Sequence, residues 1–212
     1  MQLGLTKKKQ NGIYLNIKNS KIVKSSKDKD GNRFIKEEDH YDHLTGFIKD
    51  LNLVNKSISG QPYKELQITV DTPATTDETD VKYQRYTLTY NYEKPFSTGF
   101  LLSLDNADLT KQIIIGVYSK KATEPGYKPS TYCALRYAGE KELIKWIDGY
   151  PDIEKKMIDG EEIKSTKARK DFINKTYDSL KEKLKDINIG NEIEFVDENA
   201  EADEDDGLGE SL

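Results

Sequence analysis

The chain has 212 residues, with 33 Lys or Arg against 38 Asp or Glu, a formal net charge of −5 and 35% hydrophobic residues. That length supports one domain with appendages, and the apolar fraction is enough for one core. No stretch approaches the roughly 18 consecutive apolar residues of a spanning helix, so no membrane association is expected. There is no charged-then-apolar leader, and the single cysteine, Cys133, excludes a disulfide framework, so a cytoplasmic location is expected.

Alternating apolar and polar residues predict strands through most of the first 140 positions. The first pattern covers residues 12–24 and resumes after the turn residues 28–32, which predicts a basic hairpin. The later strands are separated by short polar or Gly/Pro-rich segments. Their expected ranges are 45–54, 63–70, 81–92, 99–104, 112–119 and 131–138.

After Gly139 the pattern becomes helical, with apolar residues at helical spacing in 140–148 and 166–187. The predicted fold class is therefore mainly β with C-terminal helices. Strands joined by short turns favour a small barrel or sandwich over a parallel α/β sheet. The predicted division of the chain is a basic N-terminal hairpin or extension at 1–44, a β core at 45–139, a helical segment packing on the core at 140–190, and an acidic tail at 191–212.

The net charge is distributed unevenly along the chain. Residues 192–212 hold ten acids and no base, so subtracting −10 from −5 leaves +5 for residues 1–191. Residues 1–36 carry ten Lys or Arg against Asp28 and Asp30, a balance of +8. Blocks of like charge repel, do not pack and commonly serve as interaction tails, so the acidic end is expected to be disordered.

Two groups of residues have partial metal-site patterns. The segment Asp28–Asp39 resembles a calcium loop, but its sixth position, which needs glycine, holds Arg33. A hairpin turn explains the same residues. His40 and His43 lie beside several acids, as zinc ligands can, but no third, distant ligand is identifiable. A solvated segment before the strand at 45–54 is the favoured interpretation, and no metal site is predicted.

Sequence motifs for catalysis are missing. The chain has no phosphate-binding loop, no dinucleotide fingerprint and no nucleophile elbow. With two histidines and one cysteine, it is poorly supplied for nucleophilic triads. A non-enzymatic function without a cofactor is therefore predicted.

Tyrosine is unusually common, with 13 in the chain. On a strand at 81–92, Tyr86 and Tyr90 share one face, whereas Tyr83 and Arg85 share the other. Aromatic rings interleaved with cations are what single-stranded nucleic acid requires, because bases stack on the rings and phosphates follow the cations. Strand tyrosines that line the rim of a core explain the same pattern. Tyrosine usage alone leaves both interpretations open.

The order of a basic start, a β-rich aromatic body, C-terminal helices and an acidic tail resembles phage-type single-stranded DNA-binding proteins. The residues that carry the resemblance are 45–70, 81–92 and the acidic end at 201–212. The resemblance implies an OB-fold-like small barrel, sequence-nonspecific binding of single-stranded DNA in replication, recombination and repair, and a tail that competes with DNA and recruits replication proteins. The family's tails usually finish with an aromatic residue, whereas this chain ends in Leu212.

Two sets of site residues follow from this resemblance. The predicted nucleic-acid-binding residues are Lys49, Lys82, Tyr83, Arg85, Tyr86, Tyr90, Lys120, Lys121, Tyr132 and Arg136. The predicted partner-binding residues are Asp203, Glu204, Asp205, Asp206, Leu208 and Leu212. The location implied is the host cytoplasm of a phage, and a homodimer is compatible with this architecture. Binding of RNA stays open, and the alternative function is a protein-interaction adaptor or virion assembly component whose acidic tail binds a basic partner.

Overall fold

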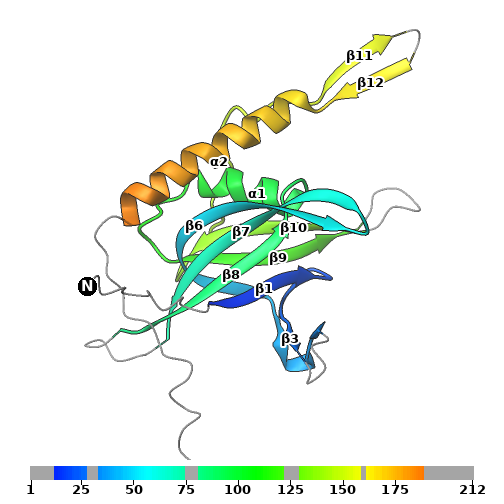
Figure 1. The fold of residues 1–212 in the computed structure, drawn as a ribbon. Coiled ribbons are helices and arrows are strands. Elements are labelled where there is room, and N and C mark those ends of the chain that lie inside the picture. Colours follow the sequence, from blue (N-terminus) through cyan, green and yellow to red (C-terminus); the bar gives the residue numbers. More distant parts are fainter. Residues whose placement is uncertain (1–11, 28–32, 75–80, 122–128, 159–160, 189–212) are drawn as a thin grey trace, which may run out of the picture.

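The structure, a computed structural model, describes residues 12–27, 33–74, 81–121, 129–158 and 161–188. Its main feature is a curled sheet of eight strands in the order β10-β9-β6-β7-β8-β1-β2-β5, with α1 and α2 on one side (Figure 1). The strands of this sheet are β1 (Ile13–Lys18), β2 (Lys21–Lys24), β5 (His40–Tyr41), β6 (His43–Ile58), β7 (Gln61–Pro73), β8 (Tyr83–Asn91), β9 (Ile113–Lys120) and β10 (Ser130–Tyr137). The remaining elements are β3 (Ser26–Lys27), β4 (Arg33–Phe34), the 3₁₀-helix η1 (Glu37–Asp39), α1 (Pro95–Leu104), β11 (Glu154–Ile158), β12 (Glu161–Ser165) and α2 (Lys167–Asn188).

The curl of the sheet brings its two ends together. One residue, Asp42, separates β5 from β6, and these two strands pair with β2 and β9 respectively. The β1–β2 turn also reaches the opposite edge strand, where the hydroxyls of Ser20 and Thr131 are 3.1 Å apart. Such closure leaves fewer unpaired backbone groups than an open sheet would.

The strand β6 organises this curl. Gly46 is needed where β6 crosses close to β7, because a Cβ atom there would lie 2.6 Å from the carbonyl oxygen of Asp71. The pairing with β7 shifts between Ile48 and Asp50, which places a bulge at Lys49. Beyond the bulge α2 packs on β6, where Tyr177 and Lys181 donate hydrogen bonds to the Leu51 carbonyl at 3.3 and 2.9 Å.

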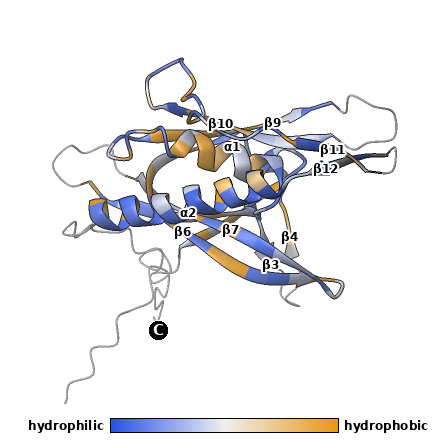
Figure 2. Cartoon of the chain, turned by 90° about the horizontal axis from the view of Figure 1, so that it is seen from above, coloured by the Kyte–Doolittle hydropathy of each residue, from blue (hydrophilic) through white to orange (hydrophobic). Residues whose placement is uncertain are grey.

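The core lies between the inner face of the sheet and α1. Phe96, Phe100, Leu101 and Leu104 of α1 are fully buried, and Figure 2 shows this helix as a hydrophobic element beside the more hydrophilic α2. The expected strand at 99–104 is wrong, because these residues form the second half of α1. An apolar run that is buried on all sides lacks the polar face that tells a helix from a strand.

The expected helix at 140–148 is also wrong. Its backbone amides bond outside the segment instead: the Ile144 amide donates to the Leu135 carbonyl at 2.8 Å, and the Ile147 amide donates to the Leu102 carbonyl at 3.0 Å. The segment therefore lies across β10 and α1, and its hydrogen bonds to them replace those that a helix would form within the segment. The β11–β12 hairpin, which the sequence analysis did not predict, extends away from the body at the start of α2 (Figure 1).

The other predicted elements have the expected type, strand or helix, although their bounds differ. The strands expected at 45–54, 63–70, 81–92, 112–119 and 131–138 correspond to β6, β7, β8, β9 and β10, and the helix at 166–187 corresponds to α2. The pattern at 12–24 splits into β1 and β2 at a turn where Asn19 and Ser20 have positive φ, as tight hairpins require. The mainly β class with a C-terminal helix is thus confirmed. The β1–β2 hairpin belongs to the same sheet as β8, and the acidic tail lies outside the described residues.

Candidate nucleic-acid interface

The strand register decides which face of β8 points outward. Val70, Ile68 and Leu66 of β7 are buried, and they pair with Tyr86, Leu88 and Tyr90 of β8. Paired residues point to the same side of a sheet, so Tyr86 and Tyr90 face the core. Tyr83, Arg85 and Thr87 therefore lie on the outer face of the sheet.

A first group of candidate contacts, the Phe47 cluster, consists of Phe47, Lys49 and Tyr83 on the outer face. The rings of Phe47 and Tyr83 pack edge to face with their centroids 6.3 Å apart. The Lys49 ammonium lies 5.6 Å from the centre of the Phe47 ring, within reach of a cation–π interaction. Lys82 directly precedes Tyr83 in the chain. The cluster thus joins two half-buried rings to a cation at one end of the sheet.

A second group, the Tyr132 cluster, consists of Tyr118, Lys120 and Tyr132 on β9 and β10. Tyr118 pairs with Tyr132 across the strands, and their rings stack with centroids 5.8 Å apart at an interplanar angle of 24°. The Lys120 ammonium lies 5.1 Å from the centre of the Tyr132 ring. The Tyr118 side chain is exposed, and so is Lys121, which directly follows Lys120. Stacked rings beside a cation are a combination that can hold a nucleobase and its phosphate.

The two clusters lie toward opposite ends of the sheet. Thr45 pairs with Ile114, and from this pair Phe47 and Tyr118 lie in opposite directions along the antiparallel strands. Six residues of strand separate them, which is about 20 Å along the strands. That spacing is compatible with the roughly 4–16 nucleotides that a single barrel covers. Arg136 lies between them on β10 and is half-buried opposite Ile114.

Arg85 has a structural partner. Its Nε and Nη2 groups donate hydrogen bonds of 2.7 Å to the two carboxylate oxygens of Asp71, whose side chain is 0% exposed. These hydrogen bonds raise the pKa of the Arg85 guanidinium. The predicted phosphate contact at Arg85 would have to come from its remaining donors.

Tyr86 and Tyr90, which we also predicted as stacking residues, are not on the outer face. The Tyr90 ring packs edge-on against Phe96 with centroids 5.1 Å apart. Tyr86 lines a cavity of about 300 Å³ together with Ile13, Lys24 and Tyr41. Tyr86 and Tyr90 therefore lie on the opposite face of the sheet from Tyr83 and Tyr132.

Phe47 was not among the residues predicted from the sequence. The signal for it in the sequence is the adjacent apolar pair Phe47-Ile48, which interrupts the apolar–polar alternation of β6. Ile48 is buried, whereas Phe47 lies on the outer face. Among the described residues, no three His, Cys, Asp or Glu side chains are grouped so that they could hold a metal ion. The predicted partner-binding residues at 203–212 and the start of the calcium-loop pattern at 28–32 lie outside the described residues.

Comparisons with protein-family models, curated proteins and solved structures find no match for this chain. No helix in the described ranges has the length and apolar character that a membrane crossing requires.

Proposed function

We propose that this protein binds single-stranded DNA without sequence preference and serves DNA replication or recombination. The observation that carries the proposal is the pair of ring-and-cation groups on one side of a curled sheet, the Phe47 cluster and the Tyr132 cluster. Each places a lysine over an aromatic ring, so that one site offers both a stacking surface and a phosphate partner.

An OB-like arrangement of β6 to β10 supports the proposal. The long β6 pairs with β7, β7 pairs with β8, and β6 also pairs with β9, which pairs with β10. If these are the five strands of such a barrel, β7 and β8 are its second and third strands, the place where oligonucleotides usually cross. The β6–β7 turn and the end of the β9–β10 pair project to the same side of the molecule (Figures 1 and 2). The β1–β2 hairpin extends the sheet beyond five strands.

The test is binding of oligo-dT, measured by fluorescence anisotropy of a labelled oligonucleotide. Replacing Tyr132 by Ala should weaken binding by about 5- to 150-fold, since stacking of one base contributes ~1–3 kcal/mol. Replacing Lys120 by Ala should weaken binding less and should also reduce the slope of log affinity against log salt by about 0.7. Competition with an RNA of the corresponding sequence measures whether the protein prefers deoxyribose or ribose in the nucleic-acid backbone.

Tyr41 provides a matched control. Its side chain is exposed, as a contact residue would be, but its hydroxyl donates a hydrogen bond to Asp39. The pKa of Tyr41 is raised, mainly by partial burial of the hydroxyl and in addition by the negative charge of Asp39. A phosphate is repelled from such a place, so Tyr41→Ala should leave the affinity unchanged. The proposal fails if the unaltered protein shows no affinity for oligo-dT in dilute buffer. Equal losses for Tyr132→Ala and Tyr41→Ala would refute the assignment of the site.

A further inference from the structure

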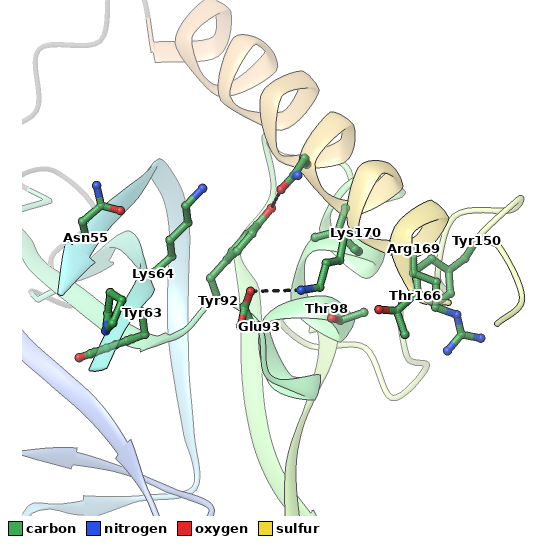
Figure 3. A pocket seen from close by; sticks show the side chains of 13 residues that line it. Asn55, Tyr63, Lys64, Tyr92, Glu93, Thr98, Tyr150, Thr166, Arg169 and Lys170 are labelled. Atoms are coloured by element: carbon green, nitrogen blue, oxygen red, sulfur yellow. Dashed lines mark hydrogen bonds and ion pairs between the residues drawn. The ribbon is translucent and has the colours of Figure 1, made fainter. Parts of the chain in front are cut away.

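A pocket of about 580 Å³ lies between the first turns of α2 and the β6–β7 hairpin, near the end of β6 and the start of β7. Figure 3 shows Lys64 on one side of it and Arg169 with Lys170 on the other. Tyr92 and Ile173 supply apolar lining between them. The outer-face clusters share no residue with this pocket.

The charges that line the pocket favour an anion. Lys64, Arg169 and Lys170 face a single acid, Glu93. Lys170 pairs with Glu93 at 3.5 Å, and Arg169 donates a hydrogen bond from Nε to the Pro151 carbonyl at 2.8 Å. Among the described residues, no carboxylate pairs with Lys64 or Arg169. The lining therefore holds two positive charges that no acid of the pocket neutralises, at opposite ends of an apolar surface.

Two of the rings in this pocket, those of Tyr92 and Tyr150, already have neighbours. Tyr150 packs edge-on against both Trp146 and Phe172, and the Arg169 guanidinium lies 5.0 Å from its centre. The Tyr92 ring packs edge-on against Tyr177, and its hydroxyl donates to the Asn174 side chain at 2.9 Å. Tyr63, the third ring of the lining, packs against no aromatic ring of the described residues. The cations at the two ends of the lining complement an extended acidic segment that passes between a strand and a helix.

We infer that this pocket is the docking site of the acid-rich segment 192–206 of the same chain. That segment carries nine acids and no base, which complements the two unneutralised cations. It follows α2, whose first turns form one wall of the pocket. The distance back along the helix from residue 188 to residue 170 is about 27 Å. A chain of the 18 residues 189–206 spans up to about 60 Å when extended, so the segment can return to the pocket.

Docking within one chain is favoured over docking between copies because a tethered segment is present at a high local concentration, on the order of millimolar. The pocket shares no residue with the Phe47 and Tyr132 clusters, which are proposed to contact DNA. The docked segment would therefore leave the cations of these clusters uncovered, and it would be free to compete for them only when released. This inference does not depend on whether the protein binds DNA.

Trp146 makes the docking measurable. It is the single tryptophan of the chain, and its ring lies 5.8 Å from that of the pocket residue Tyr150. An acceptor dye attached to Ala202→Cys should receive energy from Trp146 when the segment is docked. The native thiol of Cys133 does not interfere, because it is buried and burial raises its pKa. Transfer should fall as salt approaches about 1 M, where charges are screened within roughly 3 Å.

The full-length labelled chain is compared in two variants that change the net charge equally. Lys64→Glu, in the pocket, should reduce the docked-to-free ratio at least about five-fold. Lys175→Glu, exposed on α2 but outside the pocket lining, should leave the ratio unchanged. Circular dichroism of both variants verifies that each is folded.

Three results would overturn the inference. The first is an equal loss of transfer in Lys64→Glu and Lys175→Glu. The second is a loss of transfer on dilution with an excess of unlabelled protein, which would mean that the segment docks on a second copy. The third is displacement of the dye by oligo-dT together with weaker oligo-dT binding in Lys64→Glu, which would assign the pocket to nucleic acid. Absence of oligo-dT binding, by contrast, refutes the proposed function and leaves the docking measurement intact.

Discussion

The ion pair between Arg85 and Asp71 allows a direct test of how the outer face is held together. The Asp71 carboxylate is 0% exposed and accepts two hydrogen bonds of 2.7 Å from Arg85, whose own side chain is 33% exposed. Removing one partner of a buried pair typically costs 3–5 kcal/mol, because the other charge is left buried without compensation. Since water reaches part of Arg85, we expect Arg85→Met to lower the free energy of unfolding by about 3 kcal/mol.

The assay is a double-mutant cycle of Arg85→Met, Asp71→Asn and the double variant, followed by urea and thermal unfolding. A loss of about 3 kcal/mol corresponds to a fall in Tm of roughly 6–12 °C for a chain of this size. The double variant should recover part of the loss, because it leaves no buried charge, and the coupling energy should be at least about 1.5 kcal/mol. Strictly additive losses, or a loss below about 1 kcal/mol for Arg85→Met, would refute the structural role of the pair.

Two further predictions concern buried titratable groups. Burial raises the pKa of the Tyr92 hydroxyl, so the unfolded chain loses this proton at lower pH than the folded one, and the free energy of unfolding falls as pH rises above about 10. Tyr92→Phe should make the free energy of unfolding, measured by urea titration, less dependent on pH between about pH 9 and 11. An unchanged pH dependence would contradict the argument. Burial also raises the pKa of the Cys133 thiol, so a disulfide reagent should react with it only after unfolding, whereas rapid reaction with the native protein at neutral pH would show that β10 is not packed as described.

The sequence identified most strands because their periodicity survives in the fold. Leu66, Ile68 and Val70 alternate with polar residues, and the structure buries all three on one side of β7. The same reasoning failed where burial was not one-sided. Phe100, Leu101, Leu102 and Leu104 are all fully buried on a helix, and the one polar residue among them, Ser103, is buried as well, so no exposed polar face reveals the helical period.

The failure at 140–148 has a different cause. Helical spacing of Leu143, Ile144, Trp146 and Ile147 predicts an amphipathic helix, yet Leu143 and Trp146 are exposed while the amides of Ile144 and Ile147 bond to β10 and α1. The backbone hydrogen bonds were satisfied by distant strands and helices, and a local pattern contains no information about such partners.

The sequence likewise could not predict which face of the sheet carries the candidate site. Tyrosines occur on both sides of β8, and only the register with β7 shows that Tyr83 is outside and Tyr86 inside. Register follows from pairings between residues far apart in the chain, together with the bulge at Lys49 and the close approach at Gly46. None of these can be read from the spacing of tyrosines within 81–92.

Counting cations along the chain overstates the number available to a ligand. Arg85 is held by the buried Asp71, and Lys183 donates to Asp105 at 2.5 Å on the side of the molecule covered by α2. Lys120 differs from both, since within the described ranges no carboxylate pairs with it and it lies over the Tyr132 ring. A phosphate meets less competition at such a lysine than at one that already has an acidic partner. For a protein of mixed charge, the cations available to an anionic ligand are therefore those that remain after its own ion pairs are subtracted. Lys120 on the outer face and Lys64 in the pocket belong to this set, whereas Arg85 and Lys183 do not.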